Sequence, residues 1–287
     1  MRRAHQGKLG AETWILFLLA PAFCLAFCVF LLFGNRVHRP SRDGQQMAQF
    51  NALNAATELF AIEFDGYPPS DANDPAGRPY CGSMKLTEAL MGQDLFGFHT
   101  KSTFRRDGLD AEGTLLYPAN IDDLPIALRE SSMRTRKGPF LQAENANAYR
   151  LVDIYGEGNT GPFPEDTFVL CDTYAQRRPS DQKTGMPILY YRADSAGTTH
   201  DVHNPDNRRN IYHYQDNHAL VSLGVPGKPG ETHPLANPKR FYLNTQSCEI
   251  PSKPYRVGTF ILISAGLDGL YGTADDICNF EWEYRKR

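Results

Sequence analysis

The sequence lacks an excess of basic residues, cysteine pairs at zinc-ribbon spacing, internal repeats and the common catalytic signatures. Its 30 Lys and Arg residues against 33 Asp and Glu give a net charge of −3, which disfavours a nucleic-acid binder built on a basic surface. The absence of any C-x-x-C pair argues against a zinc ribbon. Because no G-x-S-x-G, P-loop or dinucleotide-binding fingerprint occurs, we expect a protein that is not an enzyme.

The chain nevertheless has enough apolar material to fold. Its 287 residues suffice for one large domain or two small ones. They include 17 Phe, 14 Tyr and 2 Trp, which argues against disorder throughout the chain. The 24 Gly and 20 Pro residues indicate a body with many loops.

One uncharged segment, Trp14–Phe33, is long and apolar enough to span a bilayer, because its twenty residues cover ~30 Å as a helix. Basic residues flank it on both sides, with a slight bias towards a cytoplasmic N-terminus. We therefore expect a single-pass protein of the inner membrane. Residues 1–13 form its cytoplasmic N-terminus with a candidate leader, residues 14–33 span the membrane, and residues 34–287 form a body outside the cytoplasm.

The six cysteines fall into two groups. Cys24 and Cys28 lie within the apolar segment, where they act as small apolar fillers. The other four lie in the polar body, and their even number permits two disulfides in an oxidising compartment, with three possible pairings. They are Cys81, Cys171, Cys248 and Cys278.

Two helices are predicted at the start of the body. In Gln45–Phe64, apolar residues recur every three or four positions, which is typical of a helix with one buried face. The residues of this face are Met47, Phe50, Leu53, Thr57, Phe60 and Phe64, with Leu59 and Ile62 widening it. Gly66 is suited to a left-handed cap that ends the helix. A shorter helix is expected at Ser83–Met91, with Ser83 as its cap.

Strands are predicted from β-branched and aromatic content at Thr167–Leu170, Ile188–Tyr191 and Val257–Ser264. Phe280–Tyr284 alternates apolar and charged residues and is expected to be a closing edge strand. The stretches Asp194–Asn217 and Gly224–Pro238 are rich in Gly, Pro, Asn and Asp and are expected to be loops.

An acidic, glycine-rich loop, Ser264–Asn279, follows the strongest predicted strand. Its carboxylates and glycines can supply the oxygen ligands that calcium prefers. It is not an EF-hand loop, because Asn279, and not the bidentate glutamate, stands at the twelfth position when Asp268 is counted as the first. The alternative is a solvated turn in which the aspartates bond to their own backbone.

The pattern S-x-G-x-D-G-x-x-G-T-x-D-D-I-x-N-F in this loop resembles the C-terminal loop of the major (G-type) pseudopilins of type II secretion systems. The run F-D-G-Y-P-P after Gln45–Phe64 resembles the helix exit of the same family, and a leucine-containing helix near residues 84–90 follows in the expected order. The resemblance covers roughly residues 45–97 and 257–282, and leaves residues 97–240 as a long insertion.

The resemblance implies an α+β fold. An N-terminal transmembrane helix would continue into an amphipathic helix that packs on a small antiparallel β-sheet, with a loop-rich insertion. It also implies that the terminal loop binds Ca²⁺ through Asp268, Asp275 and Asp276, with loop carbonyls such as that of Ala265 as further ligands. The family assembles through its N-terminal helices into a periplasmic filament, so the implied partners are other pilin-like subunits, secretion-machine components and the membrane.

The N-terminus carries part of the processing signal of this family. Gly7 and Glu12 have the spacing of the prepilin cleavage site, but Lys8 replaces the usual aromatic residue after the glycine. If the site is used, a prepilin peptidase cleaves after Gly7, the mature chain begins at methylated Lys8, and Glu12 pairs with the N-terminal amine of a neighbouring subunit. The alternative is a chance glycine and an interfacial glutamate beside an ordinary membrane anchor.

Three functional hypotheses follow from the sequence. The first is a pseudopilin-like structural subunit of a type II secretion or related pilus-like machine. The second is an uncleaved, membrane-tethered binding module derived from a pseudopilin. The third is a membrane-tethered metal-dependent hydrolase that uses His200 and His203, although their surroundings are loop-like and no H-E-x-x-H motif occurs.

Overall fold

The computed structural model describes residues 42–118, 121 and 125–281. The predicted membrane segment and the predicted processing residues Gly7, Lys8 and Glu12 therefore lie outside the described residues. Within the described part, no helix is long and apolar enough to cross a membrane. The chain divides into the units Met1–Gly44 and Gln45–Arg287, and the fold described below is that of the second unit.

The first described helix covers residues 42–64, which confirms the helix predicted at Gln45–Phe64. Phe50, Leu53 and Phe60 are buried on one face, as the periodicity predicts. The predicted face was too wide, because Met47, Leu59 and Ile62 are 43%, 54% and 80% exposed. The helix packs on its neighbours from one side only, so apolar residues beside the buried stripe remain in contact with solvent.

The helix ends in a left-handed turn at Asp65, whose φ is 56°, and the amide of Gly66 donates to the carbonyl of Ala61 at 3.0 Å. The prediction that Gly66 takes the left-handed conformation was therefore wrong by one residue. Aspartate tolerates this conformation better than most side chains because its short polar group can bond locally.

A three-stranded antiparallel sheet forms the centre of the fold, in the order β7 (Leu189–Arg192), β8 (Phe260–Ser264) and β9 (Ile277–Cys278). Residues 257–259 of the predicted strand are not part of β8, because Arg256 and Gly258 adopt φ values of +49° and +89° in a turn.

The edge strand was misplaced in the sequence prediction. It is β9, whereas Phe280 and Glu281, the described part of the predicted Phe280–Tyr284 strand, are not in a strand. The chain turns at residues 265–276 and then pairs immediately with β8. The terminal loop is therefore a hairpin connection between two paired strands.

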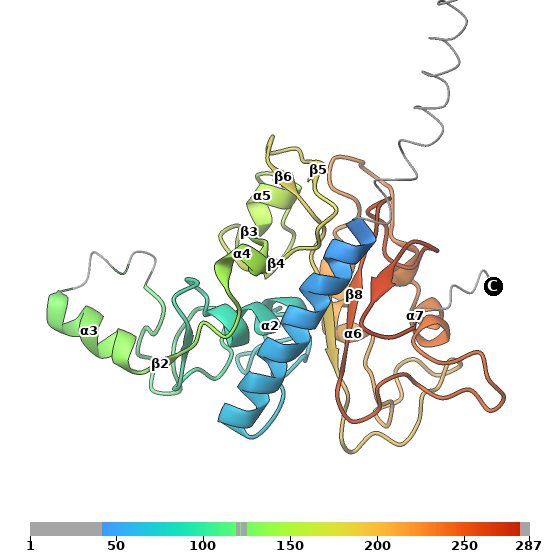
Figure 1. Ribbon diagram of the computed structural model, residues 1–287, viewed down its shortest axis with the longest axis horizontal. Coiled ribbons are helices and arrows are strands. Elements are labelled where there is room, and N and C mark those ends of the chain that lie inside the picture. The colour runs from blue at the N-terminus through green and yellow to red at the C-terminus, as the bar shows by residue number, and fades with distance from the viewer. Residues whose placement is uncertain (1–41, 119–120, 122–124, 282–287) are drawn as a thin grey trace, which may run out of the picture. The chain divides into compact units, whose positions relative to one another are not determined.

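Each side of the sheet packs against a different part of the core. Tyr190, Phe260 and Leu262 pack with the helix of residues 42–64. Tyr191 and Ile263 face the other way, towards α6 (Gln215–Val221) and α7 (Pro238–Asn244). This alternation is the period of two that a strand imposes on its side chains. Figure 1 shows the first helix in blue alongside β8, with α6 and α7 beyond the sheet.

Helix α2 (Gly82–Met91) confirms the second predicted helix, and all ten of its residues are buried. Ser83 is not its cap, because Cys81 precedes the first turn and the Ser83 hydroxyl instead donates to Asn217 Oδ1 at 2.8 Å. A side chain at Gly82 would place a Cβ 2.3 Å from the carbonyl oxygen of Tyr190. Glycine at this position therefore lets α2 approach β7 closely.

The region of residues 97–240 adds short elements around this centre, and it also supplies β7. Three two-stranded sheets join β1 to β2, β3 to β4 and β5 to β6. The predicted strand at Thr167–Leu170 is confirmed as β4, and the predicted loops are irregular apart from their last residues. The strands are β1 (Phe98–His99), β2 (Arg136–Lys137), β3 (Ala148–Arg150), β4 (Phe168–Leu170), β5 (Gln176–Arg177) and β6 (Lys183–Thr184). The helices are α3 (Ile126–Arg134), α4 (Ala143–Ala146), α5 (Leu151–Tyr155) and η2 (Pro234–Ala236).

Candidate functional site

The terminal loop between β8 and β9 places the three predicted aspartates close together. Asp276 is the buried member, with 4% of its surface exposed. Its carboxylate accepts hydrogen bonds from the amide of Gly272 at 2.7 Å and from the amide of Thr273 at 3.2 Å. Two backbone donors that the turn would leave unpaired are thus satisfied by one side chain.

Asp268 and Asp275 lie nearer the surface of the same loop. The amide of Asp268 donates to Asp275 Oδ2 at 3.0 Å, and the Thr273 hydroxyl donates to Asp275 Oδ1 at 2.8 Å. The amide of Leu270 donates to Asp268 Oδ1 at 2.7 Å. The solvated-turn alternative and the calcium alternative both contain such bonds, so these contacts do not distinguish them.

The electrostatics of the loop reflect several negative charges in one place. Burial raises the pKa of Asp276 well above its usual value, and the charges of Asp268 and Asp275 raise it further. Burial and the charge of Asp275 also raise the pKa of Asp268. For Asp275, hydrogen bonds from Thr273 and from the Asp268 backbone outweigh burial and lower the pKa. None of the three forms an ion pair with a Lys or Arg of the described residues.

The geometry of the described residues does not include a complete metal site. No group of three or more His, Cys, Asp or Glu side chains in residues 42–118, 121 and 125–281 is arranged to hold a metal ion. Ala265, whose carbonyl the resemblance implies as a ligand, is fully buried at the start of the loop. The loop therefore carries carboxylates that no Lys or Arg of the described residues neutralises. Calcium binding stays a prediction.

Two contacts fasten this loop to the rest of the fold. The hydroxyl of the fully buried Tyr271 donates to the carbonyl oxygen of Pro187, two residues before the start of β7. The amide of Tyr271 donates to His233 Nδ1 at 3.2 Å, and His233 Nε2 donates to the carbonyl of Gly224 at 3.1 Å. This pattern requires a neutral His233 that carries its proton on Nε2.

Acidification is expected to loosen the loop through His233. Burial lowers the pKa of His233 from 6.5 to about 4, so the unfolded chain binds more protons than the folded one between these pH values. The stabilisation from the neutral imidazole is present above pH 6.5 and is lost as the pH falls towards 4. Hydrogen exchange should show the protection factor of the Tyr271 amide falling over this range.

A variant provides the control for this prediction. His233→Ala removes the acceptor at every pH, so it should lower the protection of the Tyr271 amide already at pH 7 and remove most of its pH dependence. Protection of this amide in the wild type that stays constant down to pH 4 would contradict the role of His233.

A buried carboxylate, Asp172, contacts the residue that precedes the terminal loop. It accepts from the Ser264 hydroxyl at 2.8 Å and from the Met186 amide at 3.1 Å. Burial raises its pKa to about 6, although these hydrogen bonds oppose the shift. Sequence analysis did not identify Asp172, because nothing in the chain near it marks it as close to a segment 92 residues away.

Three of the four cysteines of the body are not paired as disulfides in this structure. Cys81, Cys171 and Cys278 are buried free thiols, and Cys248 is exposed. Burial raises the pKa of Cys81 to about 12, which suppresses the reactive thiolate form. The two disulfides that the even number of cysteines permits are therefore not formed here.

The two histidines of the hydrolase hypothesis have different surroundings. His200 Nε2 lies 3.0 Å from the carbonyl oxygen of Tyr242 and 3.1 Å from the Thr245 hydroxyl, and burial lowers its pKa to about 4. His203 is exposed. His200 is thus occupied by contacts with α7, and no described residues complete a metal site with it.

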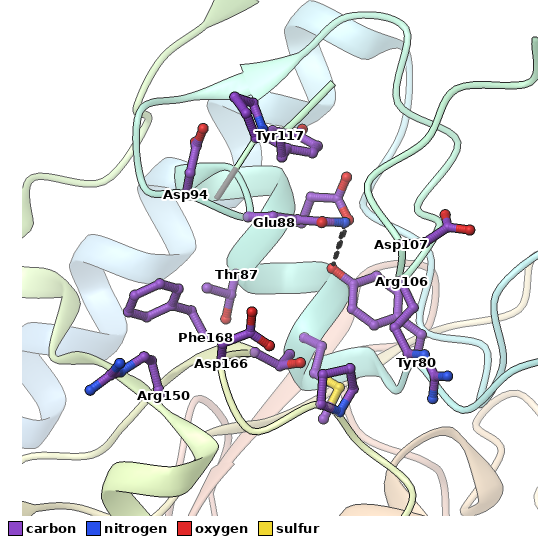
Figure 2. Close-up of a pocket in the computed structure, with 15 residues that line it drawn as sticks. Tyr80, Thr87, Glu88, Asp94, Arg106, Asp107, Tyr117, Arg150, Asp166 and Phe168 are labelled. Carbon is purple, nitrogen blue, oxygen red and sulfur yellow. Dashed lines mark hydrogen bonds between the residues drawn. The ribbon is translucent and has the colours of Figure 1, made fainter. Parts of the chain in front are cut away.

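A cavity of about 520 Å³ beside α2 was not anticipated from the sequence. Its walls come from α2, from the loop of residues 105–118 and from the residues around the start of β4. Figure 2 shows Tyr80 and Arg106 on one side of it and Arg150 and Phe168 on the other. This volume lies in the ~300–1,000 Å³ range of small-molecule and cofactor sites.

The buried carboxylate of Glu88 holds the inner wall of this cavity together. It accepts from the Tyr80 hydroxyl at 2.7 Å, from Gln93 Nε2 at 3.0 Å and from the Ser102 hydroxyl. Burial raises the pKa of Glu88, and these hydrogen bonds oppose that rise. Through these three partners, Glu88 holds Tyr80, Gln93 and Ser102 together at the wall of the cavity.

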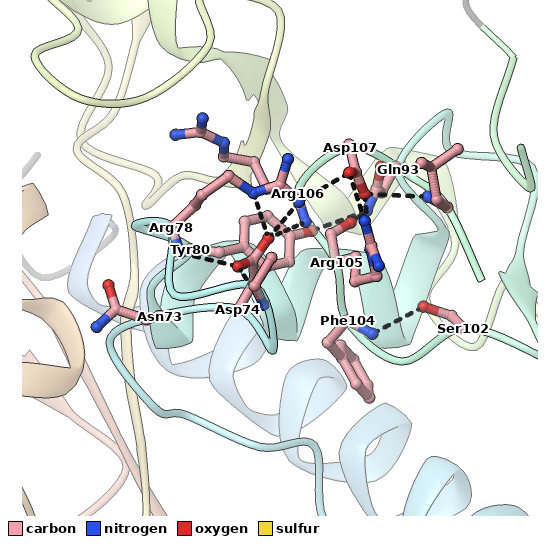
Figure 3. A network of polar contacts seen from close by, with 12 residues as sticks. Asn73, Asp74, Arg78, Tyr80, Gln93, Ser102, Phe104, Arg105, Arg106 and Asp107 are labelled. Carbon is pink, nitrogen blue, oxygen red and sulfur yellow. Dashed lines mark hydrogen bonds and ion pairs between the residues drawn. The ribbon is translucent and has the colours of Figure 1, made fainter. Parts of the chain in front are cut away.

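A network of ion pairs fixes the outer wall (Figure 3). Arg78 Nη2 lies 2.7 Å from Asp74 Oδ2 and 2.8 Å from Asp107 Oδ2. Arg105 also pairs with Asp107, and hydrogen bonds from both arginines lower the pKa of Asp107 strongly. The amide of Arg106 donates to Asp74 at 3.2 Å. The network therefore holds the backbone at Arg106 in place before any ligand arrives.

Comparison of this chain with protein-family models, with curated proteins and with solved structures finds no match in any of the three.

Proposed function

We propose that this chain is a pseudopilin-like structural subunit of a type II secretion or related pilus-like machine. The observation that carries the proposal is the order of its parts. The first described helix follows the apolar segment Trp14–Phe33 in the sequence. It packs one face on an antiparallel sheet. A hydrogen bond also joins the helix to the end of that sheet, because Asn279 Nδ2 donates to Asn54 Oδ1 at 3.0 Å. The acidic terminal loop lies between the last two strands of the same sheet.

Calcium is part of this proposal. Asp268, Asp275 and Asp276 bring three carboxylates into one loop without a Lys or Arg partner among the described residues, and a divalent cation would relieve their mutual repulsion. Bound calcium would make the β8–β9 hairpin rigid and so stabilise the body for assembly.

The exposed side of the first helix offers a surface for assembly with other subunits. Apolar residues recur there with steps of four and three, which is the heptad spacing of helices that pack against one another. Ala52 is half-buried, and the others are exposed. The series is Ala48, Ala52, Ala55, Leu59 and Ile62.

Charged substitutions on this surface are expected to block assembly without unfolding the protein. Leu59→Glu combined with Ile62→Glu should reduce filament formation at least tenfold, because two charges would be buried without partners in a helix–helix contact. Thermal stability should remain within ~1 kcal/mol of the wild type, because both side chains are exposed.

Filament yield in shearing and electron microscopy assays measures this effect. The matched control is Leu128→Glu, which places one charge at an exposed leucine of α3, away from the first helix. Assembly that is unaffected by the double substitution would contradict the proposed surface.

N-terminal processing tests the function as a whole. The intact mass and N-terminal sequence of the protein from its native membrane should show a chain that begins at methylated Lys8. Such a chain is handled as a pilin-like subunit, with Glu12 available to the amine of its neighbour. A chain that begins at Met1 or Arg2 would contradict the proposal.

The second candidate function is a permanently tethered binding module. The cavity beside α2 favours it, because an assembly subunit has no evident need for a pre-shaped cavity of about 520 Å³. An unprocessed N-terminus together with ligand binding at this cavity would support the module.

A further inference from the structure

The cavity beside α2 has no part in the assembly proposed above. We propose that it binds an extended peptide segment of a partner protein that carries both signs of charge, with a carboxylate of the peptide at Arg106 and a basic side chain at Asp166. This inference concerns a different face of the chain from the helix surface and does not depend on filament formation.

Most charged groups along the cavity are already neutralised within the fold. Arg136 Nη1 lies 2.5 Å from Asp94 Oδ1. Arg150 Nη2 lies 3.0 Å from Asp153 Oδ1. Asp107 belongs to the ion-pair network of the outer wall. These groups give the cavity its shape and have little charge left for a ligand.

Arg106 is a lining cation without a carboxylate partner in the described part of the chain. Its Nη1 donates to the carbonyl oxygen of Pro162 at 2.8 Å, which leaves donors of the guanidinium available. Its backbone is held by Asp74. A guanidinium positioned in this way suits a carboxylate, because the two groups form charge-assisted hydrogen bonds.

Asp166 is the complementary group, and it lies in the segment directly before β4. It is exposed and makes no hydrogen bond or ion pair with any residue that the structure describes. Its charge contributes to the raised pKa of Arg150, but the larger contribution comes from Asp153. Because Arg106 and Asp166 are not within ion-pair distance of each other, a ligand needs both charges to satisfy them together.

The neighbouring cavity indicates that the ligand is extended. This second cavity has a volume of about 660 Å³ and shares Arg150 and Asp166 with the first. Its lining adds Glu157 and Glu165 and does not include Arg106. The charge along the two cavities therefore changes from positive at Arg106 to negative beyond Asp166, which sets the direction of a bound peptide.

Aromatic and proline side chains provide the contacts between the charged ends. Phe168, Pro118 and Pro164 line the first cavity and are half-buried, and the buried rings of Tyr80 and Tyr117 lie behind this surface. Such residues give a peptide contact area at low cost in conformational entropy, because their side chains have few rotatable bonds.

Fluorescence anisotropy on the full-length chain in nanodiscs tests the proposal. The probe is a capped, labelled peptide, Asp-Ala-Tyr-Ala-Lys, and the reference is the neutral peptide Asn-Ala-Tyr-Ala-Gln. We expect the charged probe to bind about tenfold more tightly, because charge-assisted hydrogen bonds are stronger than neutral ones.

Two variants test whether Asp166 and Arg106 bind the charged groups of the probe. Asp166→Asn and Arg106→Gln should each weaken binding of the charged probe about fivefold or more and weaken binding of the neutral probe much less, because only the charged probe loses a charge-assisted hydrogen bond. Asp166 has no partner in the described fold, so its variant keeps the structure even if Arg106→Gln disturbs residue 162. The matched controls are Glu130→Gln and Arg134→Gln, an exposed ion pair on α3 outside both cavities.

Three results would overturn the proposal: no binding of either probe, equal affinity for both, or variants that weaken both probes equally. The N-terminal processing experiment is unaffected by any of them, so failure here is distinguishable from failure of the assembly proposal.

Discussion

Asp276→Ala is expected to make the terminal loop sensitive to protease whether or not calcium is present. The substitution leaves the buried amide of Gly272 and the amide of Thr273 without their acceptor. Each lost partner costs about 1–3 kcal/mol, so the loop should open at least tenfold more often. Limited proteolysis followed by mass spectrometry should detect cleavage between β8 and β9.

Asp268→Asn separates calcium binding from the loop's own hydrogen bonds. Asp268 is exposed, and an asparagine oxygen can still accept from the Leu270 amide. This variant should resist protease like the wild type in chelator, but should lose the extra resistance that calcium confers, because a charged ligand is gone. Equal resistance of the wild type in calcium and in chelator would contradict the calcium proposal. Asp181→Asn, at an exposed carboxylate on the β5–β6 turn, is the matched control.

Leu262→Ala is expected to cause a large loss of stability. Leu262 is fully buried at the centre of β8, and it pairs with Tyr190 of β7. It belongs to the buried cluster that joins the sheet to the first helix. Truncation to alanine would therefore leave a cavity inside the core, between the sheet and the helix. A loss of about 2–5 kcal/mol is typical of such a substitution. That is a large share of the ~5–15 kcal/mol by which folded proteins are stable.

Chemical denaturation of the full-length chain, followed by tryptophan and tyrosine fluorescence, measures this loss. Leu128→Ala provides the matched control, because Leu128 is 58% exposed on α3 and its truncation should change stability by less than ~0.5 kcal/mol. A Leu262→Ala variant as stable as the control would mean that β8 is not the centre of the core.

The first helix could be predicted because its periodicity is a local property. Phe50, Leu53 and Phe60 recur at helical spacing, and they are the residues that the sheet covers. The outer limits of the buried face were not predictable. Leu59 and Ile62 are as apolar as their buried neighbours, and only the direction from which the sheet approaches leaves them exposed.

The position of the terminal loop was predicted, but its limits were too wide, because Ser264 belongs to β8 and Ile277–Cys278 form β9. Its aspartates lie close together. The motif did not reveal which carboxylate is buried. Asp276 differs from Asp275 because the chain between Gly272 and Thr273 turns its amides towards Asp276. The supporting groups, His233 and Asp172, come from segments far away in the sequence and carry no local signal.

The sequence by itself determined the elements whose signal is periodic or contiguous: the helix at residues 42–64, α2, the core of β8 and the acidic loop that follows β8. Local spacing suffices for these, because helices and strands impose their own periods on the chain. Only the tertiary structure decided the position of the edge strand, the exposed stripe of the first helix and the cavity beside α2. Each of these depends on contacts between residues far apart in the sequence, such as those that bring Asp74 to Arg106 and the start of β4 to α2.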